Sequence, residues 1–303
     1  MSDVCPEHVP VWDSYEQLLV RYDPCLKTVW YTLAPRPLPC FNRGILGELR
    51  RLQDRIRACG HDPQAADRNP PVQYTVLASR VPGIFNLGGD LKLFCDLIGK
   101  QDGTALFDYA KACIDVLHPN LVNYEQPLTT ISLVQGDALG GGFEAAISSN
   151  VVIAEAGARF GLPEFLFNLI PGMGACSLLL RRTTPEITRR LVCGGQTYTA
   201  RQMCDLGVID LVVPDGEGEQ AVVDFIRQHR KKRNAYTALD RVCRLINPIT
   251  YQELIEVTRV WVAAALQLTP RDLRLIAALA RAQDLRFAAP PSMAPPGALE
   301  GHG

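Results

Sequence analysis

Two glutamates, Glu144 and Glu164, each follow a short glycine-containing segment, 140–144 (GGGFE) and 161–164 (GLPE). A carboxylate among apolar residues is costly unless it is hydrogen-bonded or has a function. Burial also raises its pKa toward the range that suits general acid–base catalysis. Taken singly, either glutamate could instead form a buried ion pair or cap a helix. Together with the glycine-rich backbone around them, the pair predicts proton transfer next to a carbonyl group.

Two glycine-rich loops could hold that carbonyl. Residues 140–142 lie between a predicted strand and a predicted helix, and residues 85–90 (FNLGGD) form a second loop of this kind. Unpaired N–H groups at such a turn can stabilise a developing oxyanion by roughly 3 kcal/mol per donor. Gly89 is one candidate donor, and Asp90 is expected to cap the helix that follows. The spacing matches neither Gly-x-Gly-x-x-Gly nor a Walker loop, which disfavours nucleotide binding.

Other catalytic schemes have less support. The chain has no Gly-x-Ser-x-Gly elbow, and its five histidines lie in polar or terminal contexts without an obvious partner. Its ten cysteines form no Cys-x-x-Cys pair, which argues against a zinc or thioredoxin-like site. We therefore expect no metal and no organic cofactor.

The bulk properties exclude several classes of partner. A net charge of −1 over 303 residues argues against nucleic acid as a main ligand. No apolar run approaches the ~20 residues of a membrane helix, and the acidic, polar start is unlike a signal peptide. A cytoplasmic protein without membrane insertion is the resulting expectation.

Apolar runs alternate with segments of helical spacing, which predicts an α/β fold with a mainly parallel sheet. Strands are expected at 26–33, 72–78, 130–134, 151–154 and 208–213. Helices are expected at 42–59, 91–98, 106–117, 142–149, 173–181, 186–192 and 200–206, and then at 218–232, 251–268 and 270–285.

The catalytic segments resemble those of the crotonase (enoyl-CoA hydratase/isomerase) superfamily. That family is marked by Phe-x-x-Gly-x-Asp, Gly-Gly-Gly-x-Glu and Gly-x-Pro-Glu, which match residues 85–90, 140–144 and 161–164. The resemblance places the oxyanion donors at Gly89 and Gly141 and the paired catalytic glutamates at Glu144 and Glu164.

The resemblance also implies a domain organisation and an assembly. It implies a crotonase-like ββα spiral core over residues 25–215 and a homotrimer or dimer of trimers. Residues 1–24 would form an N-terminal extension. Independently of the resemblance, the composition changes near residues 214–216, and helical spacing beyond them predicts a helical C-terminal subdomain over residues 216–287. Residues 288–303 are rich in Pro, Ala and Gly, which predicts a disordered tail.

Within the superfamily the chain is most similar to synthases of diffusible signal factors, the cis-2-unsaturated fatty acids that Gram-negative bacteria use in quorum sensing. Residues 81–95, 133–146, 161–175 and 281–283, together with Trp261, carry this similarity. Such enzymes dehydrate a 3-hydroxyacyl group on acyl carrier protein and then cleave the thioester. Asn86 and Leu87 replace the small residues that usually leave room for adenine, which favours a carrier protein over free CoA.

The mechanism implied is enolate formation at a thioester held by Gly89 and Gly141. We assign Glu164 as the base at C2 and Glu144 as the acid at the 3-hydroxyl, and the reverse assignment stays open. The acyl chain needs an apolar tunnel, for which the candidates are Leu139, Phe143, Met173, Trp261 and Ile276.

Two alternatives remain. One is an enoyl-CoA hydratase or isomerase that uses the same residues on CoA thioesters without hydrolysing them. The other is a crotonase-fold protein that acts mainly by binding a signalling partner such as a sensor kinase.

Overall fold

The computed structural model describes Trp12 and residues 14–59 and 71–288. Residues 1–11 and 13 of the expected N-terminal extension and residues 289–303 of the expected tail lie outside the described residues.

The main sheet has six strands in the order β1-β2-β3-β5-β7-β10. Only β1 and β2 pair antiparallel, and the other four pairings are parallel. The strands are β1 (Leu18–Asp23), β2 (Thr28–Leu33), β3 (Tyr74–Ser79), β5 (Thr129–Val134), β7 (Val151–Glu155) and β10 (Leu211–Val213). Strand β1 falls within residues 1–24, so part of the expected N-terminal extension belongs to this sheet.

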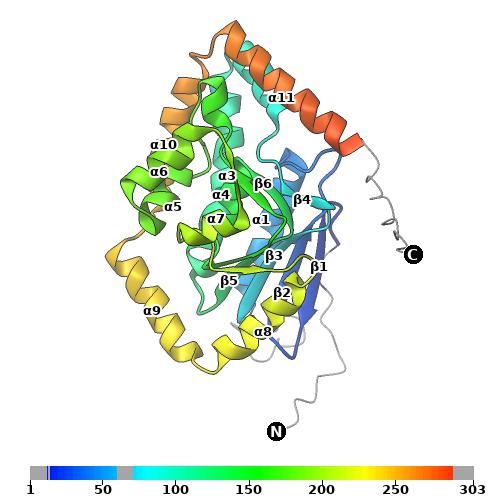
Figure 1. The fold of residues 1–303 in the computed structure, drawn as a ribbon, viewed down its shortest axis with the longest axis vertical. Helices are drawn as coiled ribbons and strands as arrows, with labels where there is room; N and C mark the ends of the chain where they lie inside the picture. The colour runs from blue at the N-terminus through cyan, green and yellow to red at the C-terminus, as the bar shows by residue number, and fades with distance from the viewer. Residues whose placement is uncertain (1–11, 13, 60–70, 289–303) are drawn as a thin grey trace, which may run out of the picture.

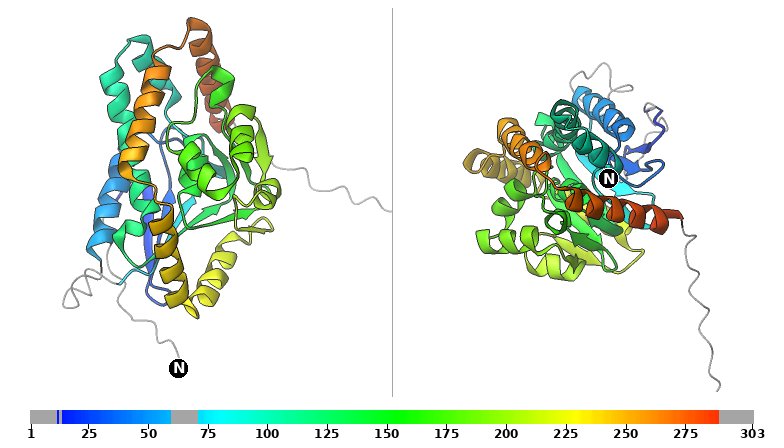
Figure 2. Two further views of the ribbon diagram at one scale, coloured as in Figure 1. Left: turned by 90° about the vertical axis from the view of Figure 1, so that its left-hand side faces the viewer. Right: turned by 90° about the horizontal axis from the view of Figure 1, so that it is seen from above.

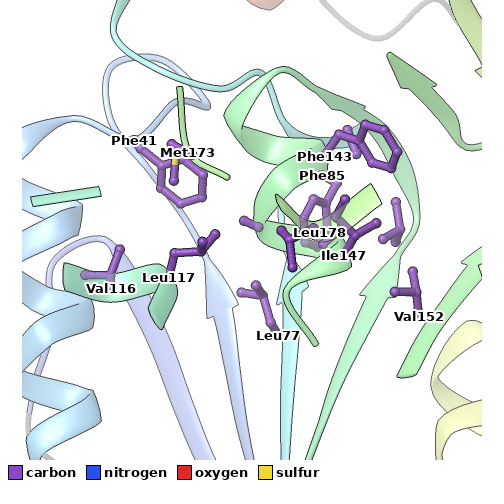
Figure 3. Close-up of a cluster of buried hydrophobic side chains, with 14 of the residues drawn as sticks. Phe41, Leu77, Phe85, Val116, Leu117, Phe143, Ile147, Val152, Met173 and Leu178 are labelled. Carbon is purple, nitrogen blue, oxygen red and sulfur yellow. The ribbon is translucent and has the colours of Figure 1, made fainter. Parts of the chain in front are cut away.

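The central strands are buried on both faces, which explains their nearly continuous apolar runs. Val76, Leu133 and Ile153 pack with α8 (Gly218–Arg230) on one face. The neighbouring residues of the same strands belong to a larger cluster on the other face, part of which is shown in Figure 3. That cluster also includes side chains from α1 (Arg43–Ala58) and α3 (Gly103–Leu121).

A second sheet of four short strands has the order β4-β6-β8-β9. Strands β4, β6 and β8 are parallel, and β9 pairs antiparallel with β8. The strands are β4 (Gly83–Asn86), β6 (Gly136–Leu139), β8 (Arg159–Gly161) and β9 (Thr197–Thr199). None of them was expected from the sequence, because three or four residues, several of them glycine, are too few to show an alternating pattern.

The two sheets are connected strand by strand. β3 leads directly into β4, β5 into β6, and β7 into β8, and helical structure follows each pair (Figure 1). These helices are α2 (Leu91–Gly99) with α3, α4 (Gly141–Ile147), and η3 (Glu164–Phe167) with α5 (Ala175–Arg182). Repetition of this ββα unit confirms the predicted spiral core.

The remaining helices surround this core. They are α6 (Pro185–Gly194), α7 (Ala200–Asp205), α9 (Arg233–Ile246), α10 (Tyr251–Ala265) and α11 (Pro270–Ala288). Helix α10 packs on α3, and α11 packs on α2. Helix α9 has no buried residue and runs along the outside of the molecule from α8 to α10 (Figures 1 and 2).

The expected helix boundaries lie within a few residues of the observed ones, but one helix was missed. No element was expected between residues 232 and 251, where the structure has α9. Tyr236, Leu239, Val242 and Ile246 recur at helical spacing there, so the signal was present. The expectation that no histidine has a partner was also wrong, because His229 Nδ1 lies 3.0 Å from the Tyr74 hydroxyl.

Candidate active site

Three parallel strands of the four-stranded sheet lead to the predicted catalytic residues. The chain leaves β4 toward Gly89, β6 toward Gly141 and β8 toward Glu164. Because parallel strands end at the same edge of a sheet, segments far apart in the sequence converge there. The backbone N–H of Gly140 donates to the carbonyl of Gly161 at 2.8 Å and holds two of these segments together.

The loops around Gly89 and Gly141 touch through their backbones. A Cβ on Gly88 would lie 3.0 Å from the Gly141 nitrogen, and a Cβ on Gly141 would lie 3.6 Å from the Gly89 nitrogen. Gly88 has φ +95°, in the left-handed region that favours glycine. Within the described residues, no protein acceptor takes the N–H of Gly89 or of Gly141. Two adjacent N–H groups are therefore available to one oxygen.

The first turn of α4 is pressed against β4. A Cβ on Gly142 would lie 2.1 Å from the carbonyl oxygen of Asn86, so only glycine fits at this position. The Asn86 side chain is fully buried, and its Oδ1 accepts the N–H of Gly88 at 2.7 Å. Asn86 therefore shapes the loop from inside and does not face the cavity.

Glu144 is buried and held in one orientation. Its Oε1 accepts the backbone N–H groups of Met173 and Ala175, each at 2.8 Å. Loss of hydration raises its pKa to about 7, although the two N–H bonds favour the charged form and limit the rise. Such a carboxyl changes its protonation state near neutral pH.

Glu164 begins η3 and faces the same space. Its Oε1 lies against Gly140, where a Cβ would come within 2.6 Å, and its Oε2 is buried without a hydrogen-bond partner within the described residues. Burial, and next the nearby Glu144 carboxylate, raise its pKa to about 8. Two close carboxylates resist being ionised together, so the pair loses its two protons in separate steps. Between these steps the two carboxyls share one proton.

A cavity of about 220 Å³ joins these groups. Gly89, Gly141, Glu144 and Glu164 all line it, and most of its wall is apolar. The wall comes from the loops around Gly89, Gly141 and Glu164 and from helices α2, α3, α10 and α11. A thioester carbonyl placed at the two N–H groups would thus lie beside both carboxyls, with apolar surface for its acyl chain.

The five predicted tunnel residues divide into two groups. Leu139, Met173 and Trp261 line the cavity, whereas Phe143 and Ile276 do not. Phe143 lies on a side of α4 that does not line the cavity. It packs edge to face on Phe160, with ring centroids 5.6 Å apart. Ile276 is fully buried within the cluster around Trp261, and Leu279, one turn later on α11, reaches the cavity instead.

Several lining residues were not expected from the sequence. Phe94 packs on both Tyr109 and Trp261, with centroid distances of 5.4 and 5.2 Å. Cys113 and Gln283 also contribute to the wall. These residues lie in segments that were expected to be helical, but helical periodicity does not distinguish the core from a cavity in it.

The part of the chain that the structure describes holds no arrangement typical of a metal centre. Across residues 14–59 and 71–288, no group of three or more His, Cys, Asp or Glu side chains could hold a metal ion. In the same part of the chain, none of the helices combines the length and apolar character needed to cross a membrane.

Comparison with known proteins identifies the family. Residues 59–256 match the model of the enoyl-CoA hydratase/isomerase family. The chain belongs to this family. A probable mitochondrial enoyl-CoA hydratase 2 of Arabidopsis thaliana is 27% identical over 186 residues, which cover 61% of this chain and 56% of the relative. The chain spans about half the length of the curated relatives it matches.

Solved structures share the fold of this hydratase/isomerase chain. The enoyl-CoA hydratase of Bacillus halodurans has a TM-score of 0.73 and 16% identity, covering 87% of this chain and all of the other. Pseudomonas aeruginosa DspI has a TM-score of 0.61 and 21% identity, covering 90% and 98%. At these identities the likeness concerns the fold alone.

Proposed function

We propose that this chain adds water to, or removes water from, the C2–C3 bond of an acyl thioester. One observation carries the proposal: two unpaired N–H groups and two carboxyls with raised pKa values line a single apolar cavity. The N–H groups of Gly89 and Gly141 would bind the thioester oxygen and stabilise the enolate. The two glutamates would move the protons at C2 and at the 3-oxygen.

In this mechanism Glu164 transfers the proton at C2, and Glu144 transfers the proton at the 3-oxygen. Dehydration then starts with Glu164 ionised and Glu144 protonated, and hydration starts with the opposite distribution. The two N–H bonds to Glu144 favour its charged form, and burial raises the pKa of both carboxyls toward neutral pH. Because the pKa values of both carboxyls are raised, either glutamate can hold the shared proton in the resting enzyme, and both directions are accessible.

The finer proposal is a synthase of cis-2-unsaturated fatty acids that dehydrates a 3-hydroxyacyl group on acyl carrier protein and then hydrolyses the thioester. Its support is the motif similarity in residues 81–95, 133–146 and 161–175. After dehydration, the carboxyl pair could activate water, and the same N–H groups would hold the tetrahedral intermediate.

Hydration of CoA thioesters without hydrolysis is the second candidate, and the family match together with the names of the relatives favours it. The substitution of Asn86 for a small residue no longer argues against CoA, because the side chain of Asn86 is turned into the loop. Leu87 does line the cavity, so of the two residues it alone still argues against the adenine of CoA.

The decisive experiment is product analysis. The purified chain would be incubated with 3-hydroxydodecanoyl-acyl carrier protein and, separately, with the CoA ester, and mass spectrometry would follow the products. Free cis-2-dodecenoic acid, absent with Glu144→Gln and Glu164→Gln, supports the synthase. An enoyl thioester as the final product supports the hydratase and rejects the hydrolytic step. Turnover that persists in both variants would reject the proposed site.

We also propose that the chain forms a homo-oligomer. The support is α9, where large apolar side chains face solvent while several polar ones, such as Asp240 and Arg244, are half-buried. The exposed set is Tyr236, Leu239, Val242, Leu245 and Ile246. Contiguous apolar surface of this kind is typical of an interface. Sedimentation of the wild type and of Leu239→Glu tests this, and a monomeric wild type would reject it and leave the face to a partner such as a sensor kinase.

A further inference from the structure

Tyr109 on α3 lies where the wall of the cavity meets the loop that carries Gly89. Its side chain is only 2% exposed, and its ring packs edge to face on Phe94. Its hydroxyl accepts the backbone N–H of Asp90 at 3.0 Å and donates to the carbonyl of Phe41 at 2.5 Å. Both hydrogen-bonding roles of the hydroxyl are therefore used within the protein.

These bonds complete a ring around Gly89. The N–H of Phe41 donates to the carbonyl of Gly88 at 2.8 Å, and the carbonyl of Phe41 accepts from Tyr109. Tyr109 in turn holds the N–H of Asp90. The peptide group before Gly89 therefore bonds directly to Phe41. The peptide group after Gly89 is linked to the same residue through the Tyr109 hydroxyl, which completes the hydrogen-bonded ring.

The ring sets the direction of the Gly89 N–H. In a trans peptide the C=O and the N–H point in opposite directions. Since the carbonyl of Gly88 points to Phe41, the N–H of Gly89 points away from it. Gly89 and Gly141 line the cavity, whereas Phe41 does not.

The phenol does not supply a proton to the substrate. Burial raises the pKa of Tyr109 well above its usual value, so the hydroxyl stays protonated at working pH. Its single hydrogen is directed to Phe41. What the hydroxyl contributes is geometry.

We propose that Tyr109 is a positioning residue that holds the Gly89 N–H in line with the thioester oxygen, through the hydrogen-bonded ring with Phe41 and Asp90. This inference rests on the proposed function, since it assigns the Gly89 N–H to a thioester oxygen. An N–H that is displaced but still present costs less than the 10²–10³-fold loss typical of a deleted oxyanion donor. We therefore expect Tyr109→Phe to lower kcat by about tenfold with KM nearly unchanged.

The direct test is spectroscopic and needs no turnover. 2,4-Hexadienoyl pantetheine, whose thioester is shared by CoA and carrier-protein substrates, would be bound to the Glu144→Gln/Glu164→Gln protein. Hydrogen bonds to the carbonyl move the absorbance of such a conjugated thioester to longer wavelength. Adding Tyr109→Phe should remove at least about half of this shift. The matched control is Tyr124→Phe, because the Tyr124 hydroxyl is equally buried but bonds Tyr31 and Asn120 away from the cavity.

The outcomes separate the two claims. A full shift that persists in Tyr109→Phe overturns the positioning role and leaves the proposed function standing. No shift in the parent protein overturns the proposed function and this inference with it. Should Tyr109→Phe not fold, 3,5-difluorotyrosine at position 109 keeps the ring and weakens the hydroxyl as an acceptor. An unchanged shift with that residue would equally overturn the role.

Discussion

The two sheets of this chain are held together in opposite ways. In the six-stranded sheet, large side chains such as Val76, Leu133 and Ile153 fill the space between the strands and α8. In and beside the four-stranded sheet, glycines, which have no side chain, allow backbone segments to approach one another closely. A Cβ on Gly136 would lie 2.2 Å from the Gly83 carbonyl carbon, and one on Gly142 would lie 2.1 Å from the Asn86 oxygen. The first sheet is a scaffold, and the second brings backbone close enough to form a site.

The comparison predicts that changes in the two sheets separate activity from stability. The largest loss of activity is expected for Glu144→Gln and Glu164→Gln, each lowering kcat about 10²–10⁴-fold in steady-state assays. Stability should not fall, because the amide oxygen at position 144 can still accept from Met173 and Ala175. Glu186→Gln on the surface of α6 is the control. Either variant keeping more than about a tenth of wild-type turnover would contradict the assignment.

Gly142→Ala should come next, with about a 10²-fold loss of kcat. The added Cβ meets a backbone oxygen, which cannot move aside as a side chain could, so α4 must shift and separate Gly141 from Gly89. Gly47→Ala is the matched control, because this helical glycine of α1 has nothing within 4 Å of the new Cβ. Equal activity of the two variants would show that the close approach of α4 to β4 is not required.

Ile153→Ala in the six-stranded sheet should lower stability and leave activity unchanged. The side chain is fully buried against α8, and truncation leaves a cavity, so the free energy of unfolding should fall by about 2–5 kcal/mol. Denaturant unfolding measures this loss, and kcat per folded molecule should stay at the wild-type value. A lowered kcat without a loss of stability would show that the scaffold and the site are not separable.

The last expected effects concern pH. Activity needs one glutamate ionised and one protonated, so kcat/KM should peak between the pKa values of about 7 and about 8 and fall on either side. In the folded state the pKa values of both carboxyls are raised from the ordinary 4.5 to about 7 and about 8. Between pH 4.5 and those raised values, the folded state therefore binds more protons than the unfolded state. Their contribution to stability is therefore fully present below about pH 4.5 and is lost as pH rises through about 8.

Unfolding measured across this range, with the double Gln variant as reference, isolates the contribution of the pair. The wild type should lose stability with rising pH relative to that variant, by an amount on the order of a few kcal/mol. Parallel stability curves for the two proteins would show that the pKa values of the pair are not raised.

Local sequence carries the proposed chemistry of this protein. The glycines and glutamates of the three motifs are contiguous runs, so Glu144, Glu164, Gly89 and Gly141 could be named from the sequence alone. The core strands could be found in the same way, because a strand buried on both faces is an unbroken apolar run. The helix cap at Asp90 was also predictable, and its carboxyl accepts from Lys92 and Leu93 as expected.

Tertiary structure alone decided how these pieces work together. The four-stranded sheet depends on backbones meeting across long sequence separations, which leaves no periodic signal in strands of three or four residues. The hydrogen bonds that hold Glu144 come from residues about thirty positions away in the sequence. The Tyr109 hydroxyl bonds to Phe41, which is 68 positions away. Leu279 lines the cavity while Ile276 on the same helix does not, because a cavity is set by where helices pack and not by which residues are apolar.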